Sequence, residues 1–392
     1  MLRFLTAGES HGPAQMAILE GIPAGLALSV SDIQKELDKR KGGLGRGGRG
    51  KIETDEVDIL SGVRLGKTMG SPIALMVKNK DFVNWQQTMS SVKLRHMESV
   101  LGSHVPVTNP RPGHADLAGV LKYGFDDVRN VSERASARET VMRAGIGAIC
   151  KKFLKEFDIS IASHTIQVGN IQMPMRPHDK KYMFEAVSKV DSIDPDIRCL
   201  DPKISQEMKK AILEAIKNKD TLGGVIEVIA HHVPVGLGSH VHWDRRLDGR
   251  LASALMSIPS VKAVEIGEGI ASSGKYGSQV HDTLQGSTLQ GRRTNRAGGI
   301  EGGISNGEEI VCKIYLKPIP TLGKPLDSVD IITKKPVKAL TERSDVCVVP
   351  RAGVIAESMM AYVLAEVFLE KFGGDSMKET KRNYNGYLRS LR

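Results

Sequence analysis

Aromatic residues and cysteines are scarce in this chain of 392 residues. Aromatic side chains make up only 4% of it, too few to favour the stacking surfaces that recognise single-stranded nucleic acid. The cysteines lie far apart, without the paired spacing of a metal site, at Cys150, Cys199, Cys312 and Cys347. We therefore expect free thiols in a reducing cytoplasm and no bound metal.

Long uninterrupted apolar segments are also absent from the sequence. No basic leader followed by an apolar stretch opens the chain, and no uninterrupted apolar run reaches about 18 residues. From this we expect neither export nor a membrane-spanning segment. The hydrophobic fraction of 40% and the charged fraction of 26% are ordinary for a globular protein with a large core.

Positive charge is in excess, with 55 basic and 45 acidic residues and a formal net charge of +10. Nucleic-acid binders often carry their basic residues along one helix face or tail. Here arginines recur instead in separate turns rich in small residues. Planar guanidinium groups bind phosphate and carboxylate oxygens in pairs. The distribution favours a pocket for a small anionic molecule. The arginines in such turns are Arg46, Arg49, Arg111, Arg134, Arg138, Arg292, Arg293, Arg296, Arg343 and Arg351.

The hydrophobic pattern predicts an α+β protein, because helical and strand-like segments mix without regular alternation. The first helix is expected to begin with Ser31 as its cap and Gln34 completing a capping box. The predicted helices are 31–40, 134–157, 205–217, 244–258 and 356–372, the last ending at Gly373. The predicted strands are 57–60, 73–77, 159–162, 225–230, 261–266, 310–316 and 347–349. We expect one catalytic domain over 1–373 and a polar, loosely held tail over 374–392.

The segment 8–12, Gly-Glu-Ser-His-Gly, follows the apolar residues Leu2, Phe4 and Leu5. This pattern predicts a strand that ends in a tight turn and presents His11. Histidine exchanges protons near neutral pH, and the flanking glycines let backbone amides approach an anion. Ser10 beside His11 does not indicate a nucleophile, because sequence neighbours rarely form a serine–histidine pair.

The glycine-rich segment 41–51 has the residue spacing of a dinucleotide-binding turn and of a P-loop, but the neighbouring residues fit neither motif. A helix precedes it, whereas a dinucleotide-binding turn follows a strand. Ile52 stands where a P-loop carries a hydroxyl residue. We interpret the segment as a flexible loop whose Arg46 and Arg49 close over an anion.

A cluster of histidines gives a weaker signal for zinc. His240 and His242 would share one face of a strand, with His231, His232 and Asp244 nearby. No cysteine pair or metal-binding helix motif supports them. A half-exposed strand is the favoured interpretation.

Eight motifs, taken in order, resemble the chorismate synthase family, and the resemblance runs from Phe4 to about Glu366. They are 8–12, 111–116, 134–140, 235–239, 264–267, 297–307, 317–321 and 343–345. The resemblance implies a sandwich of antiparallel sheets with helices between them and a cytoplasmic homotetramer. It also implies a lyase of the shikimate pathway of aromatic amino acid biosynthesis. Such an enzyme removes phosphate from 5-enolpyruvylshikimate 3-phosphate by anti-1,4-elimination, using reduced FMN without net redox change.

The resemblance also implies roles for individual residues. His11 would protonate the departing phosphate, His114 would maintain the proton balance of reduced flavin, and Asp345 would exchange a proton at flavin N5. The substrate or NADP would meet Ser10, Arg40, Arg46, Arg49, Arg111 and Arg138. FMN would meet Arg134, Ala135, Ser136, Pro259, Ser260, Gly302, Lys317, Pro318, Ile319, Pro320, Thr321 and Arg343.

This sequence departs from the family pattern at two places. Leu44 stands where tyrosine is frequent, and Pro259-Ser260 stands where Asn-Ala is usual. No added reductase domain is evident, so we expect reduced flavin to be supplied from outside, with NADPH as a possible source of the electrons. Two alternatives stay open: an NADPH-dependent flavin oxidoreductase and, less favoured, a nucleic-acid-binding protein.

Overall fold

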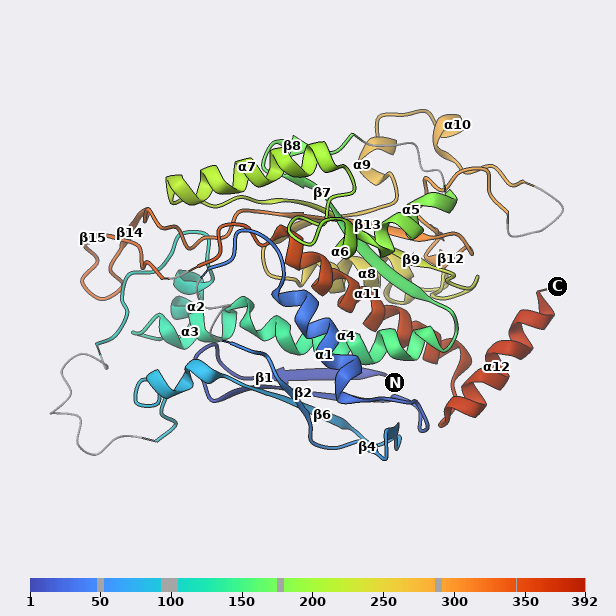
Figure 1. Ribbon diagram of the computed structural model, residues 1–392, viewed down its shortest axis with the longest axis horizontal. Helices are drawn as coiled ribbons and strands as arrows, with labels where there is room; N and C mark the ends of the chain where they lie inside the picture. Colours follow the sequence, from blue (N-terminus) through green and yellow to red (C-terminus); the bar gives the residue numbers. More distant parts are fainter. Residues whose placement is uncertain (48–52, 93–104, 175–179, 286–290, 343, 392) are drawn as a thin grey trace.

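The computed structural model describes residues 1–47, 53–92, 105–174, 180–285, 291–342 and 344–391. Two antiparallel sheets enclose a layer of helices (Figure 1). The smaller sheet has the order β1-β2-β6-β3 and the larger has the order β10-β13-β9-β7-β8. This arrangement confirms the expected α+β sandwich. Its strands are β1 (Arg3–Ala7), β2 (Ala14–Glu20), β3 (Val57–Ile59), β6 (Ile73–Lys78), β7 (Ser160–Val168), β8 (Ile171–Gln172), β9 (Gly224–His231), β10 (Val261–Ile266) and β13 (Ile310–Leu316).

The helix layer consists mainly of α1 (Val30–Lys41), α4 (Thr140–Lys155) and α11 (Val349–Phe372). Helix α4 packs against β2 and β6, while α11 packs against β7 and β9, and the two helices contact each other. A Cβ atom on Gly147 would lie 2.2 Å from the Cβ of Ser358. Glycine at this position is therefore what lets α4 and α11 approach so closely.

The remaining elements surround this sandwich. The helices are α2 (Asp116–Tyr123), α3 (Arg129–Ala135), α5 (Lys180–Ser188), α6 (Val190–Ile193), α7 (Pro202–Asn218), α8 (Leu247–Met256), α9 (Gly269–Ser272), α10 (Gly277–Val280) and α12 (Met377–Ser390). Short 3₁₀ turns are η2 (Lys80–Asn84), η4 (Ala137–Glu139) and η5 (Trp243–Arg245). Two-stranded hairpins are β4 (Val63–Arg64) with β5 (Lys67–Thr68), β11 (Ile300–Glu301) with β12 (Ile304–Ser305), and β14 (Asp327–Val329) with β15 (Pro336–Lys338).

Several predicted boundaries are wrong for identifiable reasons. Helix α1 is capped by Ser29, not Ser31, and Asp32 completes the capping box. The predicted helix 134–157 is interrupted at Ser136, whose extended backbone separates α3 from η4 and α4. The predicted strand 347–349 does not form, because Val349 begins α11. Most of the predicted helix 244–258 forms as η5 and α8.

One broader expectation also needs correction. The tail is not loosely held over most of its length, since Met377–Ser390 form α12 with Ser376 as N-cap. The rings of Tyr384 and Tyr387 pack on Phe372, so an aromatic cluster fixes this helix to the end of α11. Helix α11 is long and apolar enough, by length and composition alone, to cross a membrane. However, 83% of its apolar window is buried inside the protein, as in a core helix.

Candidate active site

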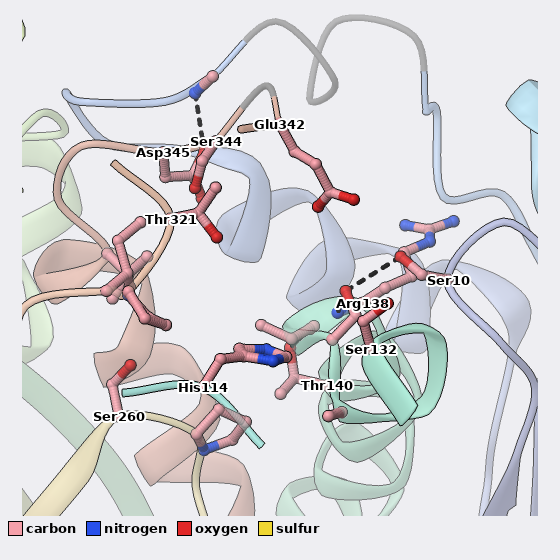
Figure 2. Close-up of a pocket in the computed structure, with 18 of the residues that line it drawn as sticks. Ser10, His114, Ser132, Arg138, Thr140, Ser260, Thr321, Glu342, Ser344 and Asp345 are labelled. Carbon is pink, nitrogen blue, oxygen red and sulfur yellow. Dashed lines mark hydrogen bonds between the residues drawn. The ribbon is translucent and has the colours of Figure 1, made fainter. Parts of the chain in front are cut away.

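One end of the helix layer opens into a cavity of about 490 Å³. Figure 2 shows its wall assembled from segments far apart in the sequence. The turn after β1, the C-terminal end of α1, the residues before α2, and the α3–η4–α4 junction all contribute side chains. The chain entering β10, the chain leaving β13 and the start of α11 complete the wall. Cavities of this size hold cofactors or small substrates.

His11 lies in the turn after β1, as predicted, and its side chain is mostly buried. Its Nδ1 atom lies 2.7 Å from one carboxylate oxygen of Glu133, and its backbone N–H donates to the other oxygen, also at 2.7 Å. The imidazole stacks on Trp85 with 3.9 Å between ring centroids. Next to it, Ser10 donates a hydrogen bond of 3.0 Å to Ser136 (Figure 2).

His114 lies just before α2 and also faces a carboxylate through Nδ1. The oxygen of Asp116 is 2.5 Å away, and Asp116 is fully buried. Burial alone would raise the pKa of Asp116, but hydrogen bonds from His114 and Arg111 hold this pKa well below its ordinary value. In both candidate proton-transfer histidines, the ring nitrogen Nδ1 therefore faces a carboxylate.

Arg111 is buried and saturated with partners. Its guanidinium donates to Asp116 at 2.8 and 3.1 Å, to Thr321 at 3.1 Å and to Glu342 at 3.1 Å. Asp116 also accepts from the Arg111 backbone N–H at 3.0 Å. The segment 111–116 is thus a closed loop that holds His114 at its centre.

Arg40 and Arg138 form a second cationic group around Asp55, which is buried. Arg138 donates to Asp55, to Glu53 at 3.4 Å and to Asn79 at 3.0 Å. Arg40 donates to Asp55 at 3.3 Å and to Thr140 at 3.1 Å. Burial lowers the pKa of Arg40 to about 10, with Asp55 opposing the change, so Arg40 stays charged at neutral pH. These carboxylates fix the arginines in position before any ligand arrives.

Asp345 joins the start of α11 to the glycine-rich loop. One of its oxygens accepts from the backbone N–H of Gly47 at 2.7 Å (Figure 2), and the other pairs with Arg351. Arg46, from the same loop, bonds the backbone oxygen of Lys41. Burial lowers the pKa of Arg46, and the positive charge of Arg351 lowers it further.

Apolar side chains line the cavity at Ile258, Pro259, Ile319, Pro320, Val348, Ala352 and Ile355. Lys317 lies beside them and donates to the backbone oxygen of Gly113 at 2.5 Å. Burial lowers the pKa of Lys317 below its ordinary value. At the departure from the family pattern, Ser260 has a left-handed backbone (φ 73°), and its carbonyl accepts from the Lys317 backbone N–H at 2.9 Å. This turn is therefore tied to the segment 317–321.

Most of the predicted site residues line this one cavity. These are Ser10, His11, Arg40, Arg46, Arg111, His114, Ala135, Ser136, Arg138, Pro259, Ser260, Lys317, Ile319, Pro320, Thr321 and Asp345. Arg49 and Arg343 lie outside the described residues. Arg134 does not line the cavity; it is exposed and donates to Thr6 and to the Gly8 carbonyl. Pro318 also points to solvent. Gly302 occupies the exposed turn between β11 and β12, away from α2 and α3 (Figure 1).

Sequence reasoning missed most of the acidic side of the site. Five carboxylates line the cavity alongside the cations; the sequence predicted Asp345 among them but not Glu53, Asp55, Glu133 or Glu342. The sequence places Arg351 among the arginines of small-residue turns and Asp116 in the 111–116 motif, but it assigns neither a specific role in the site. Asp116 could have been found from the sequence, because it is the last residue of the 111–116 motif. The other residues acquire their roles only from partners that are distant in the chain. The dense cationic pocket expected from the sequence is instead a network of arginines with carboxylate partners.

The histidines considered for zinc lie elsewhere and have other partners. His231 is 2.9 Å from Glu309, His232 is 2.9 Å from Asp158, and His242 is 2.8 Å from Asp244. Across the part of the chain that the structure describes, no group of three or more metal-ligating side chains is present.

Comparison with known proteins gives one consistent answer. The family model described as chorismate synthase matches residues 2–369. The chain is 51% identical over 402 residues to chorismate synthase of Geobacter metallireducens, with all of both chains covered. It is 50% identical over 398 residues to that of Aquifex aeolicus, covering 100% of this chain and 98% of the relative. A solved structure described as a crystal structure of chorismate synthase superposes with a TM-score of 0.79 at 41% identity, covering 100% of this chain and 98% of that one.

Proposed function

This chain belongs to the chorismate synthase family, and we propose that the cavity in Figure 2 is where its reaction takes place. The enzyme is a lyase that eliminates phosphate from 5-enolpyruvylshikimate 3-phosphate to give chorismate, and enzymes of this family use reduced FMN. The observation that carries the proposal is the meeting of His11, His114 and Asp345 in one cavity with several arginines.

We propose that the arginines bind the phosphate and the two carboxylates of the substrate. Arg40, Arg46 and Arg138 would do so from one side, with Arg49 and Arg343 assigned by the family resemblance alone. Arg111 has Asp116, Thr321 and Glu342 as partners, so its contact with substrate would require exchange of one of these bonds. The fixed guanidinium groups save the cost of ordering flexible side chains when the substrate binds.

The residues present fit reduced FMN. The cavity combines a volume of about 490 Å³ with apolar lining residues and the cation Lys317, which suits a ring system carrying a phosphate. We assign Ala135, Ser136, Pro259, Ser260, Lys317, Ile319, Pro320 and Thr321 to this cofactor, with Arg134, Gly302, Pro318 and Arg343 on the resemblance alone. When bound, reduced FMN supplies electron density that favours loss of phosphate and recovers it as hydrogen leaves the ring.

His11 and His114 handle protons in this proposal. His11 would protonate the departing phosphate, while His114 and Asp345 would hold and exchange protons at the flavin. The carboxylates Glu133 and Asp116 leave the opposite ring nitrogen, Nε2, as the atom that faces a ligand. A positioned acid or base of this kind contributes roughly 100-fold or more to a rate.

We further propose a cytoplasmic homotetramer that receives FMN already reduced, with NADPH as the ultimate source of electrons and Arg40 and Arg46 as candidate contacts for the NADP phosphate. The test is anaerobic turnover with pre-reduced FMN. The proposal expects chorismate and inorganic phosphate in equal amounts, with no stoichiometric consumption of NADPH. A requirement for one NADPH per product would instead favour a flavin oxidoreductase. Binding of oligonucleotides that weakens steeply with salt would favour the nucleic-acid alternative.

A further inference from the structure

We propose that Glu133 is a positioning residue that fixes the tautomer and orientation of His11, with Trp85 holding the ring from one face. This inference rests on the proposed function, in which His11 delivers a proton to the departing phosphate. It assigns a role to two side chains that lie outside the motifs recognised in the sequence.

Glu133 is buried and binds the turn that carries His11 at three points. Its two carboxylate oxygens accept from the His11 backbone N–H and face the His11 Nδ1, both at 2.7 Å. Its own backbone oxygen accepts from the N–H of Ser10 at 3.0 Å. One residue of α3 therefore fixes both the main chain and the ring of His11.

The carboxylate determines which ring nitrogen carries the proton. An ionised carboxylate only accepts hydrogen bonds, so the short contact places a proton on Nδ1. Among the described residues, none bonds the Nε2 atom on the opposite edge of the ring. Since His11 lines the cavity, Nε2 is the nitrogen left for a ligand.

Trp85 limits rotation of the same ring. The indole and imidazole planes are inclined by 22° with centroids 3.9 Å apart. The indole is itself held, because its Nε1–H donates to Asp81 at 3.3 Å. A ring bonded at one edge and covered on one face has little freedom to turn Nε2 away from the cavity.

These contacts have a chemical consequence in the elimination. As the carbon–oxygen bond to phosphate breaks, the bonding pair leaves with the phosphate, which takes the proton from Nε2 of the His11 imidazolium. The other proton stays on Nδ1 beside Glu133, and Glu133 itself gains none. The carboxylate thus stabilises the charged ring before transfer and keeps the neutral ring in the right tautomer afterwards.

The substitution Glu133→Gln tests this proposal, because glutamine has one acceptor and one donor end. The backbone N–H of His11 must donate, so the amide oxygen should pair with it and the amide NH₂ should face Nδ1. Nδ1 must then accept, and the neutral tautomer changes from Nδ1–H to Nε2–H. We expect ¹⁵N NMR of labelled histidine at alkaline pH to record this change, and we expect kcat to fall about 100-fold with KM for the substrate within about 3-fold.

Glu139→Gln is the matched control. Glu139 is as buried as Glu133 and follows in the same segment, but it pairs with Arg143 at 2.8 Å and does not line the cavity. An unchanged tautomer together with a kcat equal to that of this control would overturn the proposal. The NMR readout needs no turnover, so it stays informative even if anaerobic assays of the parent enzyme contradict the proposed function.

Trp85→Leu supplies a second variant in case Glu133→Gln does not fold. It removes the stacking surface but leaves the carboxylate in place. We expect a several-fold loss of kcat, an unchanged KM and a retained Nδ1–H tautomer. A rise in KM without loss of kcat would mean that Trp85 contributes to binding only, which would contradict its assignment here.

Discussion

The carboxylate of Asp345 accepts a hydrogen bond from the backbone N–H of Gly47 at 2.7 Å, across 298 positions of sequence. This bond fastens the glycine-rich loop to the start of α11, and Arg351 pairs with the other oxygen of the same carboxylate. The loop brings Arg46 to the cavity wall, so its attachment decides where that cation lies.

Gly47→Ala should detach this loop. A Cβ atom at position 47 would lie 2.5 Å from the carbonyl oxygen of Ser344, which is much closer than van der Waals contact. We expect the substrate KM to rise at least about 10-fold, the equivalent of roughly 1.4 kcal/mol of binding. Steady-state kinetics measure this. Gly386→Ala is the control, because a Cβ atom there meets nothing within 4 Å, and an equal rise in KM for both variants would refute the argument.

Asp345→Asn should separate the anchoring role of Asp345 from its proposed catalytic role. The amide oxygen can still accept from Gly47, while the negative charge and basicity are lost. We expect affinities for FMN and substrate to stay within a few-fold and turnover to fall about 100-fold. Titration calorimetry and anaerobic turnover measure the two effects. Lost binding or unfolding, with normal turnover by the remaining folded enzyme, would show that Asp345 is only structural.

His11→Ala and His114→Ala should each lower turnover by at least about 100-fold. Folding should change little, because both side chains lie in turns at the cavity wall instead of in the apolar core. Anaerobic assays and thermal melts measure the two effects. His242→Ala provides the comparison, since His242 is exposed at the start of η5 and pairs with Asp244 of that turn. Near-normal turnover in either cavity variant would remove that histidine from the proposed mechanism.

Asp116→Asn should destabilise the fold in a pH-dependent way. Folding lowers the pKa of Asp116, so its ionised form stabilises the protein above about pH 4, and this stabilisation is lost as the pH falls further. At pH 7 we expect the free energy of unfolding to fall by about 3 kcal/mol, because the buried Arg111 loses its main counter-charge. The difference in the free energy of unfolding between variant and parent protein should become smaller as the pH falls below about 4.

Urea unfolding from pH 7 to pH 3 measures this dependence. Asp327→Asn is the control, because the ion pair between Asp327 and Lys338 is exposed, and such pairs contribute little to stability. The same pH dependence in both variants would contradict the assignment to Asp116.

Buried helices and strands could be predicted from the sequence better than the boundaries of elements or the terminal helix. Helix α7 and strands β9 and β13 were recognisable because each buries a regular apolar pattern. Boundaries failed where a cap or a break depends on one polar side chain. Ser29 instead of Ser31 caps α1, and Ser136 separates α3 from η4. The terminal helix α12 was missed because its polar sequence becomes stable only when its tyrosines meet Phe372.

The sequence by itself determined the family and the α+β class, and it identified most of the residues that line the cavity. These properties follow from short motifs and local apolar patterns, which can be recognised in the sequence without knowledge of the fold. Only the tertiary structure decided that Glu133 faces His11, that Asp55 lies between Arg40 and Arg138, and that Asp345 holds Gly47. Pairings between segments so far apart arise from the packing of α1, α3, α4 and α11 between two sheets, and no local pattern encodes them.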